Sequence, residues 1–231
     1  MPIVEVATGS ALGALLGMRH ALEPDHLAAV STLVSDHRSP SRAALLGLSW
    51  GLGHTLALVV VGAALVTFQA TLSPRIADLF EFFVALMLIG LGCRAILRAL
   101  REGPRGPVAV HAHAGVVHRH PGAPEHVHVG ALTLARRPLL VGIVHGLAGS
   151  GALTALVLAT LPTTLTRVAY MTLFGLGSSL GMAALSGLLG WPLARLGGET
   201  RTLRTVSIVV GLLSAGLGLA WGAPIVDRWM W

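Results

Sequence analysis

The sequence has 231 residues, of which 54% are hydrophobic and only 11% are charged. This composition excludes a water-soluble globular protein, because one soluble core cannot hold so much apolar surface. The formal net charge of +6 comes from arginines that follow a membrane-topology pattern, so it does not indicate a nucleic-acid surface.

The apolar residues fall in runs of about twenty or more, the length that an α-helix needs to cross a hydrocarbon core about 30 Å thick. The N-terminal segment MPIVEVATGSALGALLG lacks the basic leader of a signal peptide, so we expect the first run to be kept as a helix. The predicted class is an all-α, polytopic membrane protein. Six transmembrane helices are predicted at residues 6–33, 42–66, 78–100, 138–160, 166–190 and 204–223.

The first predicted helix carries a proline beside several ionisable residues. Pro24 cannot donate a hydrogen bond to the carbonyl of His20, and its ring clashes with the preceding turn, so the helix must kink or unwind. On an unbroken helix His26 would lie about 120° around the axis from His20, and Asp25 about 140°. A break at Pro24 can bring the three side chains together and free a backbone carbonyl. Ionisable groups at membrane depth mark ion pathways, so the pattern predicts a metal site.

Neighbouring polar residues allow other interpretations. Arg19, Glu23 and Asp25 crowd one turn and could form a buried ion-pair cluster that only holds helices together. If the metal site exists, Arg19 and Glu23 would support its ligands or assist metal transfer. His54, in WGLGHTLAL of the second predicted helix, is a candidate further ligand. A lone intramembrane histidine can also serve only as an interhelical hydrogen-bond partner.

The connection between the third and fourth predicted helices is rich in histidine, within HAHAGVVHRHPGAPEHVH. Its Pro, Gly and Ala content makes a packed core unexpected. Such tracts bind metals, so this one could buffer, sense or hand over an ion; the alternative is a polar linker. The predicted loop ligands are His111, His113, His118, His120, His126 and His128.

The two halves of the chain resemble each other at offsets of 124 to 126 residues. GMRHALEPDHLAAV from Gly17 lines up with GIVHGLAGSGALTA from Gly142, which places His20 on His145. GLGHTLAL then matches GLGSSLGM, and IGLG matches AGLG. Two copies of a three-helix unit must have opposite orientations in the membrane, which predicts inverted repeats. Chance similarity among Gly- and Leu-rich helices is the alternative.

This interpretation divides the chain into a first three-helix repeat with the metal motif (1–102), a His-rich loop (103–137) and a second three-helix repeat (138–231). Gly149 would mark the helix break of the second repeat, as Pro24 does in the first. His145 has no acidic neighbour in sequence, so a supporting or transfer role is predicted for it.

The arginines are unequally distributed between alternate connections, and the sequence contains no lysine. The positive-inside rule makes the Arg-rich side cytoplasmic, so both termini would face outward and the His-rich loop would face the cytosol. The Arg-rich side has Arg38, Arg42, the arginines from Arg94 to Arg137, Arg195, Arg201 and Arg204, and the other side Arg75, Arg167 and Arg228.

HALEPDHL, residues 20–27, resembles the second-helix signature of the nickel/cobalt transporter family, and LGLSWGLGHTLALVV resembles the L-G-H motif of that family's next helix. The chain is most similar to the short six-helix, nickel-permease-like relatives among urease-accessory membrane proteins. The resemblance implies metal-site roles for His20, Asp25, His26 and His54. It is good over the first two helices and looser beyond. HGLAGSGAL replaces the family's later acidic motif, and Pro24 stands where Ala or Asp is usual.

The resemblance implies an inner-membrane permease for nickel(II) or cobalt(II), working by alternating access around the His/Asp site. Imidazole and carboxylate ligands also suit zinc(II). Loading requires neutral imidazoles, so it should weaken in acid. No cofactor is predicted; the expected partners are the lipid bilayer, the metal and a cytosolic metallochaperone. The alternatives are an intramembrane metalloenzyme, for which Glu23 is the only nearby acid or base, and a metal-delivery or sensing protein in which the loop is the active part.

Overall fold

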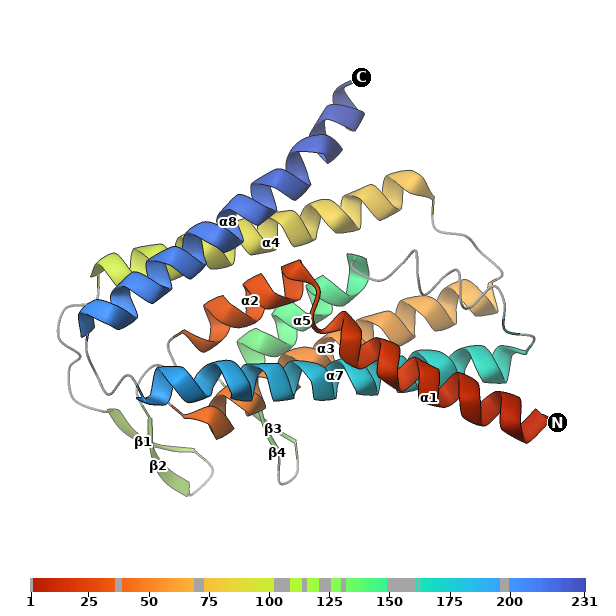
Figure 1. Ribbon diagram of the computed structural model, residues 1–231, viewed down its shortest axis with the longest axis horizontal. Coiled ribbons are helices and arrows are strands. Elements are labelled where there is room, and N and C mark those ends of the chain that lie inside the picture. Colours follow the sequence, from red (N-terminus) through yellow and green to blue (C-terminus); the bar gives the residue numbers. More distant parts are fainter. Residues whose placement is uncertain are drawn as a thin grey trace.

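The computed structural model describes residues 2–35, 39–68, 73–101, 109–113, 116–120, 126–129, 132–148, 161, 163–195 and 200–231. Within these ranges the chain is mainly helical, with two short hairpins between the fourth and fifth helices (Figure 1). The helices are α1 (Pro2–His20), α2 (Pro24–Val34), α3 (Pro40–Thr67), α4 (Pro74–Arg101), α5 (Arg136–Ala148), α7 (Thr164–Arg195) and α8 (Thr200–Met230).

Four helices of the described residues are long and apolar enough to cross a membrane. They are α3, α4, α7 and α8, and many of their leucine and valine side chains are exposed, as a lipid-facing surface requires. The chain is therefore a helical, multi-pass membrane protein. The predicted helix at 138–160 corresponds to α5 over residues 136–148, and residues 149–160 lie outside the described part of the chain.

The first predicted helix, residues 6–33, forms two helices that meet at an angle (Figure 1). α1 ends at His20 and α2 begins at Pro24, as expected for a residue that is tolerated in the first turn of a helix. The carbonyl of His20, which Pro24 cannot bond, accepts a hydrogen bond from the Glu23 N–H at 3.0 Å. The interruption therefore lies where Pro24 predicts it, and the carbonyl of His20 stays hydrogen-bonded.

The hairpins were not predicted from the sequence, which gave only a His-rich connection. β1 (Ala109–His113) pairs antiparallel with β2 (Val116–His120), and β3 (His126–Val129) pairs antiparallel with β4 (Leu132–Ala135). The second hairpin is joined to the helices, because the Ala135 N–H donates to Ser49 Oγ of α3 at 3.1 Å.

The helices pack in two groups (Figure 1). α4 and α8 form one pair, while α7 packs against α1 and α3, and α3 packs against α5. Glycines allow close approach within the second group: a Cβ at Gly17 would overlap the backbone of Phe174, and one at Gly142 would overlap that of Trp50. The first contact holds α1 against α7, and the second holds α5 against α3. Together they bring the break between α1 and α2 next to α3 and α5.

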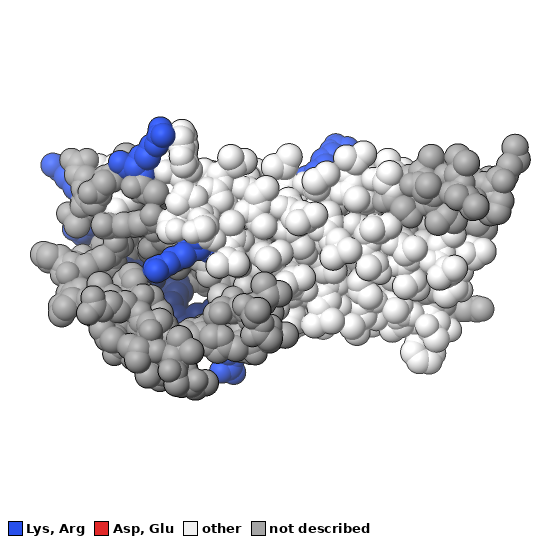
Figure 2. All heavy atoms as spheres, turned by 90° about the horizontal axis from the view of Figure 1, so that it is seen from below, with Lys and Arg blue, Asp and Glu red and all other residues white. Residues whose placement is uncertain are grey.

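Basic side chains are unevenly placed on the face seen in Figure 2: most lie at the left-hand end, and one lies on the upper edge to the right of the centre. No acidic side chain is visible on this face among the described residues. A mostly uncharged surface beside a basic end is consistent with a helix bundle in a bilayer.

Candidate metal centre

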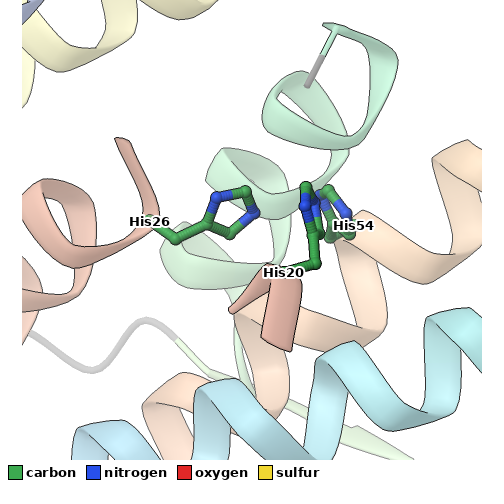
Figure 3. Close-up of side chains that lie close together, drawn as sticks. All are labelled: His20, His26 and His54. Carbon is green, nitrogen blue, oxygen red and sulfur yellow. The ribbon is translucent and has the colours of Figure 1, made fainter. Parts of the chain in front are cut away.

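Three buried histidines from three helices meet at the break between α1 and α2. His20 is the last residue of α1, His26 lies in the first turn of α2, and His54 lies in the middle of α3. The ring centroids of His20 and His26 are 4.3 Å apart, and each lies 5.3 Å from that of His54 (Figure 3). One candidate ligand atom from each ring lies within 4.8 Å of the others. This separation suits three ligands of one ion.

Four of the six ring nitrogens of this cluster have no hydrogen-bond partner among the described residues. His20 Nε2, His26 Nε2 and both ring nitrogens of His54 are buried and make no hydrogen bond within the described chain. Burying a polar atom without a partner costs about 1–3 kcal/mol. A neutral ring has one lone pair, so three of these four nitrogens, one from each ring, can be ligands of a single ion.

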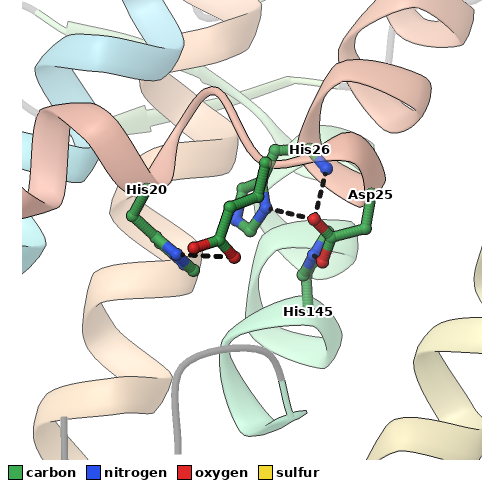
Figure 4. A network of polar contacts seen from close by, with 5 residues as sticks. His20, Asp25, His26 and His145 are labelled. Atoms are coloured by element: carbon green, nitrogen blue, oxygen red, sulfur yellow. Dashed lines mark hydrogen bonds and ion pairs between the residues drawn. The ribbon is translucent and has the colours of Figure 1, made fainter. Parts of the chain in front are cut away.

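Two carboxylates set the tautomers of the ring nitrogens (Figure 4). Asp25 Oδ1 lies 2.9 Å from His26 Nδ1, and Glu23 Oε2 lies 3.0 Å from His20 Nδ1. An ionised carboxylate only accepts hydrogen bonds, so in each neutral ring the proton is on Nδ1 and the lone pair is on Nε2. Carboxylates that orient metal-binding histidines are a common feature of metal sites. The second oxygen of Asp25 contacts another helix.

His145 of α5 is the fourth histidine of the region, with Nε2 2.8 Å from Asp25 Oδ2. Its ring is fully buried and lies 4.1 Å, centroid to centroid, from that of His26. Asp25, His26 and His145 thus form a second compact group of candidate ligands, again within 4.8 Å. The sequence predicted a supporting or transfer role for His145 but not this contact with Asp25.

Aromatic side chains form the walls of the centre. Trp50 of α3 is fully buried, and its ring lies 5.4 Å from those of both His26 and His145. Phe174 of α7 lies 5.3 Å from His20. Neither residue was predicted as part of the site, although the two occupy matching positions in SWGLGH and LFGLGS. An apolar wall limits hydration and so strengthens metal–ligand interactions inside.

The remaining predicted site residues lie elsewhere. Arg19 is exposed on α1, and Glu23 is half-buried beside His20. The proposed break at Gly149 lies outside the described residues. The loop histidines belong to β1, β2 and β3 and not to the helices that carry the cluster. Metal binding by any of these residues stays a prediction.

Comparison with known proteins shows matches over most of the chain. Residues 8–197 match the family model described as high-affinity nickel-transport protein, NicO. The urease accessory protein UreH of Bacillus sp. (strain TB-90) is 31% identical over 95% of this chain and 92% of its own length. No solved structure matches.

Two further relatives match over a smaller part of their own length. The chloroplast protein FOR GROWTH AND FERTILITY 1 of Arabidopsis thaliana is 29% identical over 92% of this chain and 58% of its own length. A high-affinity nickel transport protein of Cupriavidus necator is 33% identical over 46% of this chain and 34% of its own length.

Proposed function

This chain belongs to the NicO family of high-affinity nickel-transport proteins, and from that premise we propose that it is a membrane permease for nickel(II). The observation that carries the proposal is the buried cluster of His20, His26 and His54, whose free nitrogens converge from three helices. Relatives named as a nickel transport protein and a urease accessory protein support nickel as the substrate.

The ligand chemistry favours borderline divalent ions. Neutral imidazoles suit nickel, cobalt and zinc, and the described cluster contains no thiolate for softer ions. Cobalt(II) is therefore the second candidate substrate, and zinc(II) the third. No resident cofactor is required by this proposal, because the metal is cargo.

We propose that transport proceeds by alternating access between two inverted three-helix repeats. Contacts that recur at the offset between the halves support this arrangement. Gly17 packs on Phe174, and Gly142, 125 residues after Gly17, packs on Trp50, the matching position of Phe174. Thr55 Oγ1 and Ser179 Oγ, 124 residues apart, share a hydrogen bond of 2.8 Å, as expected for two matching residues on a twofold axis.

α4 and α8 have the same reciprocity. Gly92 packs on Gly211, while Gly218, the match of Gly92, packs on Ala85, the match of Gly211. Ser214 Oγ donates to the Leu88 carbonyl 126 residues away in sequence. Such reciprocal pairs are expected when two similar halves associate around a twofold axis, and inverted-repeat transporters hold their substrate where the halves meet.

The orientation that we propose follows the arginines. The last turn of α4 carries Arg98 and Arg101, and Arg136 and Arg137 begin α5. In the bacterial inner membrane, these residues would place the hairpins on the cytosolic side and both termini on the outer side. A metalloenzyme is a weaker alternative, because the NicO family is one of transport proteins.

Metal flux in vesicles tests the function. Purified protein in vesicles of known orientation should move radiolabelled nickel(II) at least about tenfold faster than protein-free vesicles, as expected if the buried ligands replace the hydration of the ion. Comparing the two orientations gives the direction of transport, and competition by cobalt(II) and zinc(II) gives the selectivity. Flux equal to that of protein-free vesicles for all three ions would contradict a permease.

The hairpin β1–β2 suits an accessory metal-binding role. His111 pairs with His118 across the strands, and His113 and His120 follow each of them by two positions. The backbone register thus brings two His-x-His pairs into neighbouring strands. We propose that the histidines of this hairpin buffer the metal or exchange it with a cytosolic metallochaperone.

Deleting residues 108–130 distinguishes the role of the His-rich loop from that of the membrane cluster. We expect the purified deletion variant in vesicles to keep at least about half of the wild-type nickel flux, because the membrane cluster is built from α1, α2 and α3. The number of nickel ions bound per chain should fall. Flux and equilibrium dialysis with nickel(II) measure the two quantities. Loss of flux in a folded deletion variant would show that the loop is the active part and would support a delivery or sensing protein.

A further inference from the structure

Asp25, His26 and His145 form a group of ligands adjacent to the three-histidine cluster, with His26 in both. We propose that these three residues are a second coordination position, and that the transported ion passes between the two positions through His26. The inference rests on the proposed transport function and identifies His145 as a metal ligand.

The distances in the second group fit a coordination sphere. Asp25 Oδ1 lies 2.9 Å from His26 Nδ1, and Asp25 Oδ2 lies 2.8 Å from His145 Nε2. With metal–ligand bonds of about 2.0–2.2 Å, neighbouring ligand atoms of one ion lie about 3 Å apart. Ligand atoms at these separations can bind one ion once the rings turn so that their lone pairs point at it.

The single lone pair of His26 makes the two positions mutually exclusive. A neutral imidazole has one protonated nitrogen and one lone pair. While His26 Nδ1–H donates to Asp25, Nε2 can bind an ion held with His20 and His54. When Nδ1 binds the ion beside Asp25 and His145, the proton must be on Nε2, which then cannot serve the first position. One ion is therefore held at a time.

The protons balance during this exchange. The His26 proton is on Nδ1 at the first stage and on Nε2 at the second. His145 donates Nε2–H to Asp25 at the first stage, and its proton moves to Nδ1, which is now buried without a partner, when Nε2 takes the ion. Each ring keeps one proton, so the step needs no net proton release.

The helices that supply the ligands suit a transfer between the two halves of the chain. His20 is on α1 of the first half, and His145, its match 125 residues later, is on α5 of the second half. His26 lies between them, with ring centroids at 4.3 Å from His20 and 4.1 Å from His145. The first half thus contributes His20 to the first position, and the second half contributes the matching His145 to the second position. His26 is the ligand that the two positions share.

The experiment replaces His145 by glutamine and by alanine in the full-length chain. A glutamine amide can reproduce the hydrogen bond from Nε2–H to Asp25, but it is a poor ligand for nickel. We expect His145→Gln to bind one nickel(II) at the membrane site with Kd within about threefold of wild type, since the first position is intact. Nickel flux should fall at least about tenfold in both variants, as expected for loss of a ligand group.

X-ray absorption of bound nickel(II), in protein that lacks residues 108–130, identifies the position directly. His54→Gln should retain one ion, with two imidazoles and a carboxylate as ligands in place of three imidazoles. Wild-type flux in His145→Gln would overturn the proposal, because His145 would then only orient Asp25. Equal losses of binding and flux in that variant, or two membrane-site ions in wild type, would also overturn it. Absence of flux in wild type would refute the permease function, while the absorption and binding results would still test the second position.

Discussion

Replacing His26 by alanine is expected to lower nickel flux by about a hundredfold or more, because even outer partners of a metal ligand contribute about 10- to 100-fold. His26 has the largest expected effect of the four histidines, since its two nitrogens face both groups of candidate ligands. Its removal also leaves Asp25 Oδ1 without its buried ring partner. Flux in vesicles and Kd for nickel(II), measured on the same preparation, should both change.

A histidine outside the cluster gives the matched control. His37 is not one of the candidate ligands, so His37→Ala makes the same chemical change without removing a nitrogen of the cluster. It should transport nickel(II) at the wild-type rate. A folded His26→Ala protein with wild-type flux and affinity would show that the buried histidines hold the helices together and do not bind the ion.

Replacing Gly142 by alanine is expected to destabilise the fold by about 3 kcal/mol, at the upper end of overpacking effects. A Cβ at this position would overlap the Trp50 carbonyl, and a backbone atom on a packed helix cannot move aside as a side chain can. Trp50 lies against His26 and His145, so the displaced helix should also weaken nickel binding. The thermal unfolding midpoint in detergent and Kd for nickel(II) measure the two effects.

Glycines of α4 and α8 provide controls that distinguish overlap with a packed backbone from the effect of an added methyl group. A Cβ at Gly90 or Gly216 would meet no atom within 4 Å, so alanine there should change stability by no more than about 0.5 kcal/mol. Gly17→Ala should resemble Gly142→Ala, because it meets the backbone of Phe174 in the matching place. An unfolding midpoint for Gly142→Ala equal to that of Gly90→Ala would contradict the close contact between α3 and α5.

The sequence predicted the parts of the fold that local chemistry controls. Long apolar runs can satisfy their backbone groups in lipid only as helices, which made α3, α4, α7 and α8 predictable. Pro24 lacks an N–H, so the interruption between α1 and α2 was predictable as well. The strands of the hairpins were missed, because the alternation of apolar and polar residues in HVHV (126–129) and LTLA (132–135) covers only four residues each, within a segment rich in Pro, Gly and Ala.

By itself, then, the sequence determined a helical membrane protein with a broken first helix and predicted the residues of a candidate ion site within it. Only the tertiary structure decided how those residues are used. The contact between Asp25 and His145 joins residues 120 positions apart in sequence, and no local pattern predicts a contact between residues so far apart. The direction of each ring nitrogen likewise depends on its carboxylate partner and on which helices the glycines allow to approach. The ligand types follow from local sequence, whereas their grouping around one shared histidine follows from packing.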